Sequence, residues 1–175
     1  MLSQAIHTHD LLTYLLGSVA SVFARTTTRV NPVEVEDCAV ASLVMECGAL
    51  ASVSATLGSH KEISRLRLCF EHVTFESALS PYSPGDDPWE IVPASSEAAD
   101  RIAGVLDSHD FAASGYEGLM PAYHQALATG SALPVTLDDA RRSLELITAL
   151  YHSSATEAAV ALPLGPEHPR YRGWS

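Results

Sequence analysis

Residues 37–57 read DCAVASLVMECGALASVSATL and carry the clearest strand signal in the chain. The first half, residues 37–46, is almost continuously apolar, which is typical of a strand covered on both faces. Cys47 and Gly48 can turn the chain into a second strand at residues 49–57, where apolar and small polar residues alternate. The link is too short for a crossover helix, so the two strands are predicted to pair antiparallel.

Further strands and several helices are expected on both sides of this hairpin. Strand patterns continue the meander at residues 19–29, 65–70, 73–76 and 89–92. Helical spacing of apolar residues predicts helices at residues 2–16, 116–128 and 136–157. The last helix has a stripe that is expected to face a core, formed by Leu144, Ile147, Leu150, Tyr151 and Ala155. The chain is thus predicted to be one α+β domain, residues 1–175.

The Pro-rich and acidic stretch at residues 80–110 interrupts these patterns and is a possible loop excursion. Within it, residues 95–106 are expected to form either an acidic helix or a mobile segment.

Composition excludes several classes of protein. Apolar residues make up 47% of the chain and charged residues 18%, so a packed core is expected and disorder is not. Ten Lys and Arg stand against 21 Asp and Glu, a net charge of −11 that disfavours binding to nucleic acid and to anionic membranes. The three cysteines have no paired spacing, and no signal peptide is recognisable, so a cytoplasmic protein is expected.

The first helix contains the one cluster with catalytic potential, His7, His9 and Asp10. On a helix His7 and Asp10 share a face, whereas His9 points nearly opposite, so the two histidines cannot readily meet one metal ion. Three hypotheses stay open here. The residues are structural, or His7 acts as a general acid or base near neutral pH, or all three serve a metal-dependent hydrolase.

Other familiar catalytic motifs are absent from the sequence. There is no Gly-x-Ser-x-Gly elbow, and the cysteines lie in apolar strands, where thiols are usually inert. Neither Gly-x-Gly-x-x-Gly nor the phosphate-binding Gly-x-x-x-x-Gly-Lys-Ser/Thr occurs, so no cofactor-binding residue is predicted. The residues alone therefore indicate an α+β domain with one histidine site.

Four segments, taken in order, resemble the second domain of the Gfo/Idh/MocA family, the oxidoreductases of the glucose–fructose oxidoreductase and inositol dehydrogenase type. The first is LSQAIHTHDLLTYLLG at residues 2–17. The second combines VEDCA at residues 35–39 with GALA at residues 48–51. The third runs from LPVT at residue 133 to ARRSLEL, which ends at residue 146, and the fourth is the tail, with LPL at residue 162 and HPRYRGW at residues 168–174.

The resemblance implies an open, mostly antiparallel sheet with helices on one face and a partner subunit on the other, hence a homodimer. It also implies an enzyme whose N-terminal Rossmann domain binds NAD or NADP, with a sugar or polyol held between the two domains. By position, His7 matches the family's acid/base residue and Asp10 a supporting acid. Trp89, Tyr82 and Tyr116 are candidates to line the sugar site, or else they anchor loops.

Two departures bear on activity. Ser3 stands where the family often has an Asp, and the family's Glu-Lys-Pro lysine is missing, since Lys61 does not match it. The chain is expected to be a truncated or mis-started product, a fragment, or half of a split gene whose Rossmann domain is a separate partner. We expect a substrate-binding and dimerisation domain that is inactive alone. The alternatives are a freestanding ligand-binding or scaffold module and the metal-dependent hydrolase at His7, His9 and Asp10.

Overall fold

The computed structural model describes residues 5–81, 85, 88–110, 113 and 115–174. Contacts within the chain divide it into two compact units. The first unit combines Met1–Glu62 with Asp138–Ser175, and the second is Ile63–Leu137. Each unit is described by itself.

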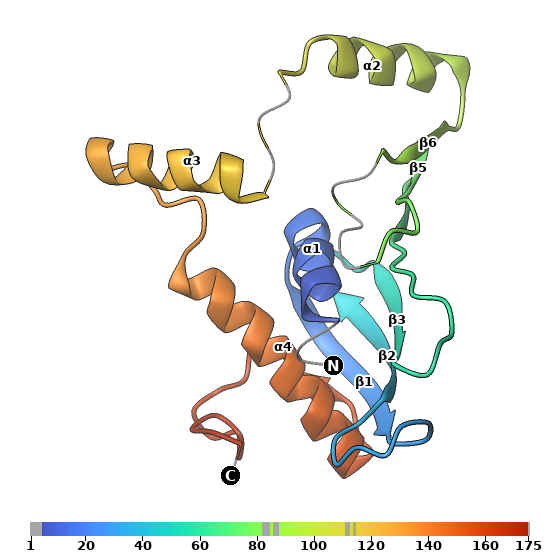
Figure 1. Cartoon of the computed structure of the whole chain (residues 1–175), viewed down its shortest axis with the longest axis vertical. Helices are drawn as coiled ribbons and strands as arrows, with labels where there is room; N and C mark the ends of the chain where they lie inside the picture. Colours follow the sequence, from blue (N-terminus) through green and yellow to red (C-terminus); the bar gives the residue numbers. More distant parts are fainter. Residues whose placement is uncertain (1–4, 82–84, 86–87, 111–112, 114, 175) are drawn as a thin grey trace. The chain divides into compact units, whose positions relative to one another are not determined.

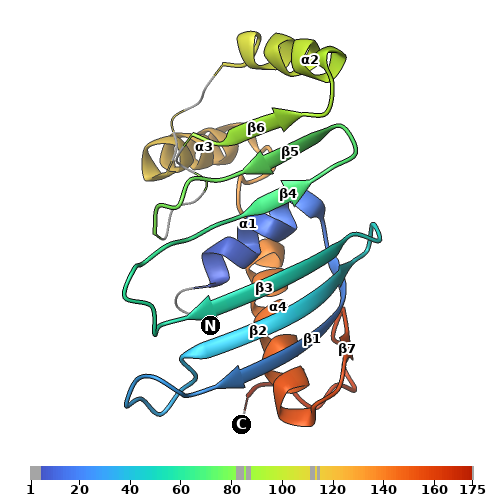
Figure 2. The same cartoon turned by 90° about the vertical axis from the view of Figure 1, so that its right-hand side faces the viewer.

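The first unit is an antiparallel sheet with helices on one face. The strands lie in the order β3-β2-β1-β7. Helices α1 and α4 lie on the same side of this sheet, and the opposite side is open (Figures 1 and 2). The bounds of these elements are α1 Ile6–Leu16, β1 Val19–Thr27, β2 Cys38–Met45, β3 Leu50–Thr56, α4 Leu137–Thr156 and β7 Val160–Ala161. The α+β class with antiparallel pairing is confirmed.

Strand β2 shows why the core lies on one side only. Alternate side chains of β2 are buried under the helices, and these are Ala39, Ala41, Leu43 and Met45. The side chains between them, Val40, Ser42 and Val44, are exposed on the open side. The prediction of a strand covered on both faces is therefore wrong for the isolated chain. The apolar run looked continuous because Val40 and Val44 occupy the open face.

Helix α4 supplies the other half of this core. Ile147 and Leu150 are buried as predicted, but Leu144 remains 49% exposed and Ala155 is exposed as well. The buried face instead runs through Leu146 and Ser153. The prediction is therefore wrong at both ends of the stripe. The spacing of apolar residues identifies the side of a helix that faces the core, but not which residues at its margins are buried.

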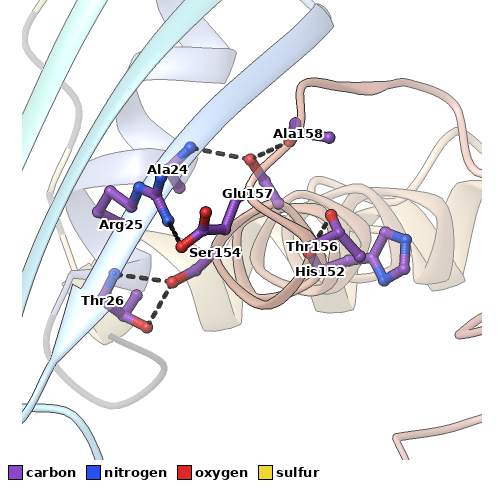
Figure 3. Close-up of polar contacts among 9 residues, drawn as sticks. Ala24, Arg25, Thr26, His152, Ser154, Thr156, Glu157 and Ala158 are labelled. Atoms are coloured by element: carbon purple, nitrogen blue, oxygen red, sulfur yellow. Dashed lines mark hydrogen bonds and ion pairs between the residues drawn. The ribbon is translucent and has the colours of Figure 1, made fainter.

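The outer edge of β1 is covered by the end of α4. Strand β7 pairs with β1 only at Ser21 and Val22. Beyond that point the backbone N–H of Ala24 donates to Ser153 Oγ and that of Thr26 to Ser154 Oγ, each at 2.9 Å (Figure 3). Side-chain oxygens thus replace a neighbouring strand at this edge, which would otherwise be free to pair with another chain.

An ion pair reinforces the same edge. Arg25 lies 2.6 Å from Glu157, just beyond the last turn of α4 (Figure 3). Both side chains are well exposed, so the pair contributes little stability on its own.

The connection from β1 to β2 is held by one carboxylate. Buried Asp37 accepts hydrogen bonds from the backbone N–H groups of Asn31, Arg29 and Val30, at 2.7, 2.8 and 2.7 Å. These donors stabilise the charged form, so they hold the pKa of Asp37 well below its ordinary value.

The second unit has a smaller antiparallel sheet, in the order β4-β5-β6, and two helices. The predicted helix at residues 95–106 is present, and Ser95 Oγ caps its start by accepting the N–H of Ala98 at 3.2 Å. The bounds are β4 Arg67–Cys69, β5 Val73–Glu76, β6 Glu90–Pro93, α2 Ser96–Asp107 and α3 Gly115–Thr129. In the part of the chain that is described, no helix is both long and apolar enough to cross a bilayer.

Candidate functional site

Helix α1 presents His7 and Asp10 on its exposed side. The helix is anchored through buried Ala5, His9 and Leu12, which recur at helical spacing. Both His7 and Asp10 are exposed, which agrees with the prediction that they share one face of the helix. The helix ends at Gly17, whose φ of 84° suits glycine and whose N–H donates to the Thr13 carbonyl at 2.9 Å.

His9 belongs to the core and not to the exposed pair. It is only 2% exposed, and neither ring nitrogen has a hydrogen-bond partner. Burial disfavours the charged imidazolium and lowers the pKa of His9 to about 4, so the ring is neutral at physiological pH. His9 therefore cannot act together with His7.

The metal-dependent hydrolase receives no support from this arrangement. Within the described ranges, no three His, Cys, Asp or Glu side chains come together in a way that could hold a metal ion. A hydrolytic metal site normally needs at least three protein ligands.

Asp10 is tied to the long helix of the same unit. Ser143 on α4 donates its hydroxyl hydrogen to Asp10 Oδ1 at 2.6 Å. This bond joins α1 to α4 next to the face that carries His7. Sequence reasoning missed Ser143, since a serine on a helix gives no sign of a bond to a residue so distant in the chain.

The other predicted site residues lie in the second unit or outside the described residues. Trp89 is half-buried just before β6, and Tyr116 is 77% exposed near the start of α3. Tyr82 and Ser3 fall outside the described residues. The proposed contacts of Trp89 and Tyr116 with a sugar stay predictions.

A groove of about 260 Å³ lies in the first unit, but His7 is not among the residues that line it. Thr13 of α1, Glu46 after β2 and Arg141 of α4 contribute to its walls. Arg141 lies 3.3 Å from Glu145, which also accepts the backbone N–H of Leu164 at 2.8 Å. His7 thus stands on an exposed surface of this unit, outside the groove. Of the charged residues that line the groove, Arg141 and Glu145 are paired with each other.

Comparison with known proteins shows which family the segment that carries His7 resembles. Residues 1–76 match the family model described as GFO/IDH/MocA C-terminal domain, a range that includes the whole of α1. No match was found among the curated proteins.

Several solved structures have the same fold. The WlbA dehydrogenase from Bordetella pertussis, solved with NADH and UDP-GlcNAcA, is 25% identical, with a TM-score of 0.72 over 92% of this chain and 45% of its own. The WlbA dehydrogenase from Chromobacterium violaceum, with the same two ligands, is 26% identical, with a TM-score of 0.71 over 94% of this chain and 46% of its own. The aldose-aldose oxidoreductase from Caulobacter crescentus, at 18% identity and a TM-score of 0.69, covers 90% of this chain and 46% of its own, and supports the fold alone.

The chain therefore spans about 45% of the length of the first of these relatives. The resemblance read from residues 2–17 and the three later segments is confirmed. Residues 1–76 match the model of the GFO/IDH/MocA C-terminal domain, and over more than nine-tenths of its length the chain has the fold of the corresponding part of the WlbA dehydrogenases.

Proposed function

We propose that this chain is the substrate-binding and dimerisation domain of an NAD(P)-dependent sugar or polyol oxidoreductase. The observation that carries the proposal is the position of His7, which is exposed on α1 inside the segment that matches the family model. An exposed imidazole can accept or donate a proton at a ring nitrogen, so His7 suits proton transfer at the reacting oxygen of an alcohol. Asp10 lies on the same face of the helix as His7 and accepts the hydroxyl hydrogen of Ser143, and we assign it a supporting role.

The proposed substrate class is supported by the relatives with the highest identity reported above. Both WlbA structures contain UDP-GlcNAcA, a sugar nucleotide, and both share the fold over more than nine-tenths of this chain. A sugar derivative is accordingly the first ligand to test, with the sugar ring placed near the exposed face of α1.

The residues of this chain do not fit a nicotinamide dinucleotide. Such a cofactor needs a parallel βαβ unit with a glycine-rich turn at the helix N-terminus. All recorded strand pairs between described residues are antiparallel, and the sequence has no Gly-x-Gly-x-x-Gly. We therefore place cofactor binding on a separate Rossmann domain and expect no dehydrogenase activity from this chain by itself.

The open face of the first sheet is the proposed dimer contact. Its exposed apolar side chains are Phe23, Val40, Val44 and Leu50, and serines lie between them. Arg25 is the one charged residue in strands β1, β2 and β3, and it is paired with Glu157. On a chain of net charge −11, a nearly uncharged face suits contact with a second copy, because no like charges are brought together.

Ligand binding to ¹⁵N-labelled protein tests the substrate proposal. On addition of UDP-GlcNAcA we expect amide shifts to cluster at Ile6, His7 and Asp10. The His7→Ala variant should weaken binding, whereas the matched variant at an exposed loop histidine, His60→Ala, should not. Shifts that leave α1 untouched, or equal binding by His7→Ala and the wild type, would instead favour a freestanding ligand-binding or scaffold module.

A further inference from the structure

The C-terminal segment, residues 164–174, lies along α4 in the first unit (Figure 1). Its last aromatic residue is fixed by two contacts with α4. Trp174 donates its Nε1 hydrogen to Thr148 Oγ1 at 2.9 Å, and its ring meets that of Tyr151 edge-on at a centroid distance of 5.4 Å. We call residues 164–174 the strap.

Two histidine rings form a third contact between the strap and α4. His168 of the strap packs edge-on against His152 of α4, with centroids 4.4 Å apart. The Nδ1 atom of His168 accepts the backbone N–H of Arg170 at 3.2 Å, so this nitrogen carries no proton. The Nε2 atom is buried and has no hydrogen-bond partner. The strap therefore holds His168 as a neutral ring with its hydrogen on Nε2.

Arg170 connects His168 to Trp174. Its backbone N–H is bound by His168, and its guanidinium donates to the carbonyl of Trp174. A change at the His168 ring therefore reaches the docked tryptophan through a single residue.

A proton on His168 conflicts with the contacts that this ring makes with Arg170 and His152. Protonation of Nδ1 removes the acceptor for the Arg170 N–H. The positive charge then faces His152 from α4 and Arg170 from the strap itself, while the neighbouring Glu167 is exposed. Burial first, and then the neighbouring His152 and Arg170, lower the pKa of His168 from its ordinary value.

We propose that the strap is docked on α4 while His168 is neutral and is released when His168 binds a proton, uncovering Thr148 and Tyr151. The device uses only residues of α4 and the strap. It is independent of the proposed oxidoreductase function.

Fluorescence of Trp174 provides the test. The chain has two tryptophans, so Trp89→Phe leaves Trp174 as the only emitter. Between pH 8 and pH 5.5 we expect the emission to shift to longer wavelength, with a midpoint below pH 6.5, while the far-ultraviolet circular dichroism stays constant. Constant emission over this range would overturn the proposal, and so would loss of ellipticity in the same transition.

Two variants in the Trp89→Phe background identify the titrating group. His168→Asn offers Arg170 an oxygen acceptor that does not titrate, and His168→Phe keeps a ring against His152. Both should make the emission independent of pH, whatever its wavelength. The control, His124→Asn on the exposed side of α3, should retain the transition. A transition that persists in both His168 variants would overturn the proposal.

Discussion

The two compact units bury their apolar residues to very different extents. In the first unit, the side chains of Val22, Leu43, Met45, Ile147 and Leu150 are almost completely inaccessible. In the second, the buried apolar side chains among the described residues are Leu66, Leu68 and Ala126. Helix α3 instead exposes apolar side chains at helical spacing, namely Tyr116, Met120, Tyr123 and Leu127.

This difference indicates that the first unit contains the packed core and that the second unit mainly presents exposed surface. A sheet covered on one face by α1 and α4 has a complete core, because strand alternation and helix periodicity direct their apolar sides to the same place. The second unit has strands of only three or four residues and a helix, α2, with no buried residue. We therefore expect the first unit to supply most of the free energy of unfolding.

Matched leucine truncations give the largest expected effect. Leu150→Ala removes a side chain that is 1% exposed in α4, and should lower the free energy of unfolding by about 2–5 kcal/mol. Leu127→Ala makes the same change at a position 64% exposed in α3, and should cost at most about 0.5 kcal/mol. Urea unfolding measures both values. Similar costs for the two variants would show that the units share the stability.

Acid sensitivity should also arise in the first unit, at His9. In the folded chain the pKa of His9 is lowered to about 4 from 6.5, so folding requires the neutral ring. Above pH 6.5 the neutral His9 ring leaves the free energy of unfolding at its full value. As the pH falls from 6.5 toward 4, protonation of His9 in the unfolded chain lowers the free energy of unfolding by about 3 kcal/mol in total.

The matching measurement compares urea unfolding at pH 7 and pH 4.5. His9→Leu should abolish most of the loss seen in the wild type, whereas His124→Asn, in the second unit, should leave it unchanged. An undiminished loss in His9→Leu would assign the acid sensitivity to other groups.

Much of the first unit follows from sequence patterns alone. The alternation in β3 and the spacing of α1 and α4 predict these elements to within a few residues. The same helical spacing predicts that His7 and His9 point in nearly opposite directions, and in the structure His7 is exposed and His9 is buried. What could not be predicted depends on contacts distant in the sequence. Ser143 with Asp10 and Ser153 with Ala24 join helices to partners more than 120 residues away.

The open face of β2 shows a second limit of sequence patterns. An apolar run indicates burial, but it does not distinguish a face covered by the chain's own helices from one available to another molecule. Val40 and Val44 therefore read as core although they are exposed in the single chain.

The smallest expected effect concerns self-association of the chain through the first unit. Val40 is 56% exposed on the open sheet face, and Val40→Lys should raise the dimer dissociation constant at least about tenfold, roughly 1.4 kcal/mol. Leu127→Lys places the same charge on the exposed side of α3 and should leave the dimer intact. Light scattering across a concentration series measures both. A monomeric wild type at micromolar concentration would refute the dimer contact.

Titration calorimetry of the purified chain with NADH addresses the division of labour most directly, with full-length WlbA as the positive control. We predict no heat of binding at micromolar concentrations, because the antiparallel strands and the absent glycine-rich turn provide no place for the dinucleotide phosphates. A micromolar dissociation constant for NADH would contradict this assignment and make the chain a cofactor-binding protein.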